Sequence, residues 1–372
     1  MTKKRQITAA RMIPALLLLA VLVSACAPQG PAANATPSPD RFKGQVIRAL
    51  AFEGYTSPDV VKDFEDKYGV KVESVFAYSN DEIFANLKAG GGANFDLATI
   101  TSDVWKKVID SDLVQPIDTS KLTNYASVPQ KLRELPTGMK DGKTYVVPFS
   151  WGAEVLVYNK DAFPTPPDSW GAIFDEANKG KIAGWDNVNS LAITALYLGY
   201  DNPFSTEAEQ LAKVKSTMCA QHALVRTYAG QISDYVNLFQ SGDANLALTG
   251  GTEVVTALQD QGVKNVDFII PKEGTLAWVD GLFVTKGAKN PELVNLLIDH
   301  MISAKPQAAL FKSMGFGLAN PAGYADFPAE QTAVIRKVDP DQNKDKRFVP
   351  WSEVDNYDLW TQTWNEVKAG CQ

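Results

Sequence analysis

Two residues in the segment LAWVDGL, Trp278 and Asp280, could do chemistry together. Side chains of a β-strand alternate between its two faces, so these two residues share a face if the segment is extended. A carboxylate beside an indole is costly on a dry face unless a charged or hydrogen-bonding group satisfies it. The segment therefore predicts a carboxylate that needs a partner. Asp280 could cap a turn, pair with a lysine of the protein, or bind a cation from outside the protein.

No catalytic motif stands out in the sequence. It has no G-x-S-x-G and no H-E-x-x-H, and the glycines at 90–92 lack the lysine and hydroxyl residue of a phosphate-binding loop. The two histidines, His222 and His300, have no Cys or His at ligand spacing. We therefore expect a protein that is not an enzyme and that has no metal site and no cofactor.

The N-terminus predicts export and lipid attachment. Four basic residues and a short apolar run, 13–23, precede the quartet VSAC, which ends at Cys26. This order is typical of a signal peptide, and the position of the Cys resembles a bacterial lipobox. We expect residues 1–25 to be removed, Cys26 to carry a lipid, and the Pro- and Ala-rich residues 26–43 to form a flexible linker. An ordinary secretory signal with an incidental Cys is the alternative.

The net charge limits the class of molecule that the protein can bind, and the cysteines predict a disulfide. Removal of residues 1–25, which hold four basic and no acidic residues, changes the formal net charge from −7 to −11. An acidic protein is a poor partner for nucleic acid or an anionic membrane face, and it is compatible with a cationic ligand. Outside the cytoplasm, Cys219 and Cys371 predict a disulfide, with two free thiols as the alternative.

The elements that must position Trp278 and Asp280 alternate between strands and helices. The elements at the start of the chain have the order βαβαβ, which implies a parallel sheet flanked by helices. Further along, Asp141-Gly142 predicts a hairpin turn before a long extended run over 144–159. Strands are predicted at 45–52, 70–78, 96–100, 245–249, 266–271 and 277–285. Helices are predicted at 58–68, 81–88, 190–198, 211–219, 236–240, 291–302, 306–314 and 356–369.

Several of these segments carry a family resemblance. The chain resembles the polyamine-binding (spermidine and putrescine) solute-binding proteins of ABC importers, over most of its length after the signal peptide. The resemblance lies in SNDEIFANLKAG, FDLATITS, SKLTNYASVP, VPFSWGAEVLVYNKDAF and PKEGTLAWVDGLFVTKGAKNPE.

The resemblance implies an α/β, two-lobed type II periplasmic-binding fold with the ligand between the lobes. Each lobe is expected to hold a mainly parallel sheet flanked by helices, and the chain to cross between lobes twice, near 148–150 and near Trp278. Lobe 1 would comprise residues 44–148 and 279–320, and lobe 2 residues 149–278 and 321–372.

The resemblance also assigns roles to single residues. Asp280 would pair with an ammonium group of the ligand, and Trp278 would line the cleft; a cation beside an indole and a carboxylate is physically well matched. The ligand-binding residues implied in this way are Trp278, Asp280, Asp186, Tyr55, Phe52 and Phe316. Three of them have structural alternatives: Asp280 could cap a turn or bind a lysine, Tyr55 could pack against the first helix, and Asp186 could cap a later one.

The sequence departs from the family pattern at three places. Residues 101–103 are Thr, Ser and Asp where the family has a tyrosine wall, Asn189 stands where it has a second carboxylate, and residues 250–251 are Gly-Gly where it commonly has Trp. The aromatic box is therefore thinner than usual. Asp103, Glu253 or Glu353 could replace the missing carboxylate.

Together these observations predict a monomeric, lipid-anchored protein outside the cytoplasm. It would capture a small cationic ligand of the polyamine type and deliver it to an ABC permease. The same fold with a quaternary amine, an amino compound or a metal is the first alternative, although the sequence lacks the Tyr-Tyr pair typical of ferric-iron binders. An exported hydrolase or an adhesion protein is the second.

Overall fold

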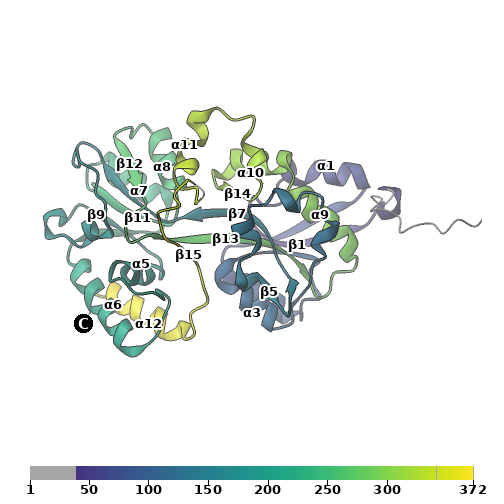
Figure 1. Ribbon diagram of the computed structural model, residues 1–372, viewed down its shortest axis with the longest axis horizontal. Helices are drawn as coiled ribbons and strands as arrows, with labels where there is room; N and C mark the ends of the chain where they lie inside the picture. The colour runs from purple at the N-terminus through teal and green to yellow at the C-terminus, as the bar shows by residue number, and fades with distance from the viewer. Residues whose placement is uncertain (1–38, 341, 372) are drawn as a thin grey trace, which may run out of the picture. The chain divides into compact units, whose positions relative to one another are not determined.

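The computed structural model describes residues 39–340 and 342–371, which belong to one compact unit (Figure 1). The predicted signal peptide, Cys26 and most of the predicted linker lie outside the described residues. The sequence predicts a linker up to residue 43, whereas Pro39–Phe42 already forms a 3₁₀ helix, η1. The ring of Phe42 is fully buried against Tyr68, so the end of the predicted linker is part of the folded unit.

Two sheets define two lobes in the described part of the chain. Lobe 1 holds an eight-stranded sheet and lobe 2 a five-stranded sheet. The first sheet has the order β14 (Gly317–Leu318), β7 (Val147–Ala153), β13 (Thr275–Thr285), β3 (Leu97–Thr101), β1 (Val46–Phe52) and β2 (Lys71–Ala77), with β4 (Val114–Gln115) and β15 (Phe348–Pro350) also paired to β13. The second has the order β10 (Val225–Ala229), β9 (Ile182–Trp185), β11 (Leu246–Thr249), β8 (Val155–Asn159) and β12 (Val266–Ile269).

Helices flank both sheets (Figure 1). Lobe 1 carries α1 (Pro58–Tyr68), α2 (Asn80–Ala89), α3 (Trp105–Asp110), α4 (Gln130–Arg133), α9 (Pro291–Met301) and α10 (Ala304–Met314). Lobe 2 carries α5 (Ser190–Tyr197), α6 (Ala208–His222), α7 (Ile232–Gln240), α8 (Glu253–Asp260), α11 (Ala329–Lys337) and α12 (Tyr357–Lys368). Further 3₁₀ helices are η2 (Ser102–Val104), η3 (Thr119–Lys121), η4 (Tyr125–Ser127), η5 (Pro136–Gly138), η6 (Trp170–Phe174), η7 (Glu176–Asn178) and η8 (Pro321–Tyr324). None of the helices in the described ranges is long and apolar enough to cross a membrane.

Local sequence signals explain several of these elements. Helix α1 begins with Pro58, which suits a first helical position, and it ends at Gly69, whose φ of 61° is the left-handed conformation that glycine adopts at little cost. The hairpin of β5 (Met139–Lys140) and β6 (Lys143–Thr144) turns at Asp141 and Gly142, with φ of 51° and 70°. Positive φ at both central residues is the requirement of a tight hairpin turn, as the Asp-Gly pair predicts.

The sheets are mixed, and not mainly parallel as the resemblance implies. Strand β1 runs parallel to β2 and β3, but β13 runs antiparallel to β3 and β7. In lobe 2, β8 is antiparallel to both β11 and β12. The reason lies in the long connections: β7 leads out of lobe 1 and β13 leads back into it, so these adjacent strands run in opposite directions.

The passages between lobes lie beyond the predicted positions. Both β7 and β13 stay in the eight-stranded sheet, and the chain changes sheets at Glu154 and again within residues 270–274. It changes lobes a third time after η8, because the ring of Tyr324 packs on Phe311 of α10, whereas Lys337 of α11 pairs with Asp267 of β12.

Alternating side chains on the strands build the buried core. On β8, Val155 and Val157 belong to the cluster that also fills lobe 1, and Leu156 and Tyr158 face a second cluster. That second cluster contains Trp360 and other apolar residues of α12. The five-stranded sheet is therefore covered on both faces, which explains the continuous apolar runs of its strands.

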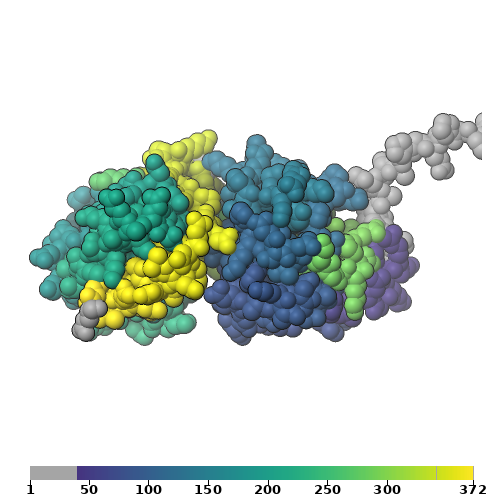
Figure 2. Space-filling model, turned by 90° about the horizontal axis from the view of Figure 1, so that it is seen from below, coloured from purple at the N-terminus to yellow at the C-terminus, as the bar shows by residue number. Residues whose placement is uncertain are grey.

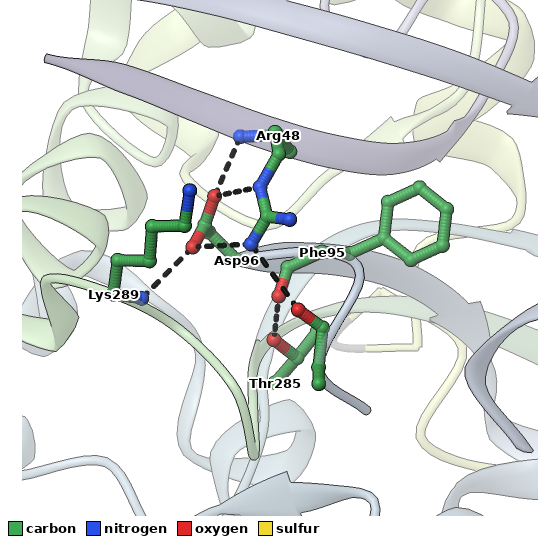
Figure 3. Close-up of polar contacts among 6 residues, drawn as sticks. Arg48, Phe95, Asp96, Thr285 and Lys289 are labelled. Carbon is green, nitrogen blue, oxygen red and sulfur yellow. Dashed lines mark hydrogen bonds and ion pairs between the residues drawn. The ribbon is translucent and has the colours of Figure 1, made fainter. Parts of the chain in front are cut away.

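A network around Asp96 fixes one end of the larger sheet (Figure 3). One oxygen of this buried carboxylate accepts hydrogen bonds from Arg48 N and Nε at 2.8 and 3.1 Å, and the other accepts from Arg48 Nη2 and Lys289 N at 3.2 and 2.9 Å. Burial raises the pKa of Asp96, but the hydrogen bonds from Arg48 and from the Lys289 backbone outweigh burial and leave the pKa below its ordinary value.

The C-terminal segment, from β15 to residue 371, returns along both lobes. In Figure 2 it appears in yellow against the teal residues of lobe 2, and it reaches the blue residues of lobe 1. Cys371 forms a disulfide with Cys219 of α6, with a Cα–Cα distance of 5.8 Å and a sequence separation of 152 residues. The predicted cysteine pair thus ties the end of the chain to lobe 2.

Candidate functional site

The register of β13 surrounds Asp280 with hydroxyl groups. Asp280 lies opposite Thr101 of β3 on one side and opposite Ser150 of β7 on the other. Thr101 Oγ1 donates to Asp280 Oδ1 at 2.6 Å, and Ser150 Oγ donates to Oδ2 at 3.4 Å. The hydroxyl of Tyr55, which stands just before α1, donates to the same Oδ2. Among the described residues, Asp280 neither caps a turn nor pairs with a lysine, which are the two structural alternatives that the sequence leaves open.

No cation of the described protein neutralises this carboxylate. Asp280 is 5% exposed, and its hydrogen bonds come from three neutral hydroxyl groups. Burial raises the pKa of Asp280, and the hydroxyl donors lower it only in part. A buried carboxylate in this state gains free energy when a cation approaches it, because the ion pair recovers part of the lost hydration.

An aromatic hollow of about 260 Å³ opens onto Asp280. The ring of Phe316 meets that of Trp278 edge to face, with centroids 4.9 Å apart, and Trp278 Nε1 donates to the Gly250 carbonyl at 3.1 Å. The side chains around the hollow are those of Phe52, Tyr55, Thr101, Trp278, Asp280, Met314, Phe316 and Trp351. The structure therefore brings together all of the predicted ligand-binding residues except Asp186.

Asp186 stands apart from this hollow. It follows β9 at the surface, and its Oδ1 lies 2.7 Å from Lys368 Nζ of α12. The sequence assigns it to the ligand or to a helix cap, but in the structure its charge is neutralised by a lysine 182 residues away. The N-cap position of α5 is Asn189 instead.

A second hollow, of about 470 Å³, adjoins the first. The two share Phe52, Thr101 and Trp351 as lining residues, and the second is rich in acidic groups. It is lined by Asp81, Asp103, Glu353 and Asp355, with Lys107 as a basic residue. Of the three carboxylates that the sequence offers as replacements, Asp103 and Glu353 line this hollow, and Glu253 lines neither.

Asp103 is the most perturbed acid of the second hollow. Its Oδ1 accepts a hydrogen bond from Asn80 Nδ2 at 2.7 Å. Burial raises the pKa of Asp103 to about 7, against the lowering effect of that hydrogen bond, and the negative charge of Asp280 adds to the rise. Asp103 is therefore poised between its neutral and charged forms near neutral pH.

Two tryptophans that sequence reasoning misses, Trp185 and Trp351, lie close together, and Trp351 lines both hollows. A Cβ atom at Gly250 would lie 2.6 Å from the ring of Trp185, so this glycine leaves room for that indole. Trp185 lies 6.2 Å from Trp351, centroid to centroid. Trp351 borders both hollows and follows a strand of three residues, too short to give a pattern in the sequence.

A two-lobed α/β chain with a charged, aromatic hollow has the architecture of a solute-binding protein. A family model described as "Bacterial extracellular solute-binding protein" matches residues 59–334, well over half of the 372 residues. The chain belongs to this family.

Individual relatives agree with this assignment. The chain is 24% identical to a putrescine/cadaverine-binding protein of Pseudomonas aeruginosa, an alignment that covers 96% of this chain and 99% of the relative. Among solved structures, the spermidine/putrescine ABC transporter substrate-binding protein PotD of Streptococcus pneumoniae has a TM-score of 0.76 at 18% identity, covering 88% of this chain and all of that one. The Tp0655 lipoprotein of Treponema pallidum has a TM-score of 0.71 at 22% identity, covering 87% of this chain and 99% of that one.

Proposed function

We propose that this protein binds a small organic cation of the polyamine class and delivers it to the permease of an ABC importer. The observation that carries the proposal is Asp280, a buried carboxylate held by three hydroxyl groups without a cation of the described protein. It opens onto an aromatic hollow. An ammonium group there would gain a charge-assisted hydrogen bond to Asp280 and attraction to the indole face of Trp278.

The names of the relatives support this ligand class. Putrescine and cadaverine appear in the name of the P. aeruginosa protein, and spermidine and putrescine in that of the S. pneumoniae structure. We extend the class to this chain because its own hollow offers an acid and aromatic rings. Quaternary amines would contact the rings but could donate no hydrogen bond to Asp280, which makes them the weaker candidates.

We further propose that Asp103 takes a second ammonium group. Thr101 donates to Asp280, borders both hollows and stands two residues before Asp103. A ligand bound at Asp280 could therefore extend past Thr101 toward Asp103. A diamine would pair with both acids at once. Asp103 would then take the role of the carboxylate that the family has where this chain has Asn189.

The working site would be outside the cytoplasm, with the chain acting as a monomer held to a membrane through Cys26. The VSAC quartet supports this proposal, and the T. pallidum structure comes from a protein named as a lipoprotein. Cys26→Ser should release the protein from the membrane fraction of cells. Retention of the variant at the wild-type level would show that another feature anchors it.

Isothermal titration of the purified protein tests the ligand class. The panel comprises putrescine, cadaverine, spermidine, a monoamine of matched length, choline as a quaternary amine, and 1,4-butanediol as an uncharged analogue of putrescine. We expect the diamines to bind most tightly and the diol to give no signal. Tight binding of choline alone would favour a quaternary-amine carrier, and the absence of binding by every amine would refute the proposal.

A further inference from the structure

Glu154 lies where the chain passes from the sheet of lobe 1 to that of lobe 2. It is the single residue between β7 and β8, and it is fully buried. Its main chain is bonded to the returning strand: Glu154 N donates to Leu276 O at 3.0 Å, and Thr275 Oγ1 donates to Glu154 O at 2.6 Å. The passage is therefore already fixed by backbone bonds that any residue at position 154 could keep.

The side chain of Glu154 makes a single hydrogen bond among the described residues. Trp351 Nε1 donates to Glu154 Oε1 at 3.0 Å, and Oε2 is buried without a partner. Burial raises the pKa of Glu154 well above its ordinary value, against the lowering effect of the Trp351 hydrogen bond. A buried oxygen without a partner costs about 1–3 kcal/mol, which an apolar side chain at this position would avoid. Packing where the chain passes between the lobes therefore does not explain why residue 154 is a glutamate and not an apolar residue.

The one bond that Glu154 makes reaches the binding site. Trp351 is half-buried and borders both hollows, and its backbone N–H donates to Ala277 O of β13 at 2.8 Å. The backbone bond fixes where the residue stands, but the indole could still rotate about its two side-chain torsions. Because the indole N–H lies in the plane of the ring, its bond to Glu154 fixes the orientation of that plane.

We propose that Glu154 is a positioning residue of the binding site, which holds the indole of Trp351 as the wall shared by the two hollows. The inference deepens the proposed function and rests on it for the part that concerns ligand affinity. Trp351 would replace the aromatic wall that the sequence lacks at residues 101–103 and 250–251, and Glu154 would give it the rigidity that a wall needs.

Four variants and a matched control test the proposal by titration with putrescine. Glu154→Leu removes the acceptor but fills the space, and we expect affinity to fall about tenfold. Glu154→Gln keeps the acceptor oxygen and should bind within twofold of wild type. Trp351→Phe should reduce putrescine affinity about as much as Glu154→Leu does. The double variant, Glu154→Leu with Trp351→Phe, should lose no more putrescine affinity than either single variant, because each single change already removes the hydrogen bond between Trp351 and Glu154.

The control is Thr275→Val, which deletes a hydroxyl bond at the same passage without touching Trp351. It should leave putrescine affinity unchanged. Wild-type affinity in Glu154→Leu, or losses that multiply in the double variant, would overturn the proposal.

A second measurement does not depend on any ligand. The indole N–H resonance of Trp351, assigned as the signal lost in Trp351→Phe, should shift in Glu154→Leu and stay near its wild-type position in Glu154→Gln and Thr275→Val. An unchanged resonance in Glu154→Leu would refute the positioning role even if no amine binds, whereas failure of amine binding alone would refute the proposed function.

Discussion

Asp96 and Asp280 are two buried carboxylates near opposite ends of one strand pair, β3 and β13. Asp96 is 2% exposed and Asp280 5% exposed, so burial acts on both. Asp96 is surrounded by the guanidinium of Arg48 and two backbone N–H groups, and its pKa is lowered (Figure 3). Asp280 has hydroxyl donors alone, and its pKa is raised. The comparison separates burial from counter-charge: both acids are buried, and of the two only Asp280 lacks a cation among the described residues.

The largest effect should come from removing the charge at Asp280. Asp280→Asn keeps the shape of the side chain, and the loss of one member of a buried charge pair costs about 2–5 kcal/mol, so diamine affinity should fall at least about thirtyfold. The empty protein should be as stable as wild type, because no protein cation loses its partner. Titration and thermal melting check the two parts. A melting temperature that falls while affinity stays within twofold would make Asp280 a structural residue.

Asp96→Asn should show the reverse pattern. It removes the counter-charge of the partly buried Arg48, and we expect a loss of about 2–3 kcal/mol in the free energy of unfolding, with diamine affinity within twofold of wild type. The pKa of Asp96 is lowered by folding, so its contribution is present above the ordinary pKa of an aspartate and is lost as pH falls through the folded value. Urea unfolding between pH 3 and pH 7 measures this. Equal stability of the variant and wild type at pH 7 would contradict it.

The pH dependence of diamine binding should reveal Asp103, which lines the second hollow. Its pKa is about 7 in the empty protein, and pairing with an ammonium requires the charged form. Diamine affinity should therefore be about tenfold weaker at pH 6 than at pH 8. The matched monoamine controls for Asp280, and Asp103→Asn should abolish the difference between the two ligands. The same pH profile in Asp103→Asn would exclude Asp103 from the site.

The smallest effect is expected at the exposed pair of Asp186 and Lys368. Lys368→Met should lower stability by less than about 1 kcal/mol, since ion pairs at the surface contribute little. Diamine affinity should stay within twofold. A clear gain in affinity on removal of Lys368 would mean that Asp186 is available to the ligand after all, as its position in the sequence suggests.

Local patterns in the sequence account for the parts of the fold that depend on near neighbours. Helix α1 follows from Pro58, Gly69 and the apolar spacing between them, and the strand around Asp280 follows from its apolar run. The sequence does not predict where the strand divides, because residues 147–159 read as one long extended run, whereas the structure splits it at Glu154 into β7 and β8.

The site is harder to predict because its partners come from distant parts of the chain. The pairing of Asp186 with Lys368 spans 182 residues, and Trp351 meets Glu154 across 197. Spacing along a sequence carries no information about contacts between residues so far apart. The family resemblance covers Trp278 and Asp280 but not Trp351. Of the three hydroxyl groups around Asp280, the resemblance indicates that of Tyr55, whereas the role of Thr101 depends on the register of β3 against β13.

The position of the C-terminal segment, from β15 to residue 371, has a consequence for how the fold is completed. β15 pairs with β13, Trp351 closes the hollow, and Trp360 and Trp364 of α12 fill the core of lobe 2. A chain without residues 348–371 would therefore lack a finished core in lobe 2, and Cys219 would lack its disulfide partner. Chains truncated before β15 should expose apolar surface to proteases and should lack a complete ligand site.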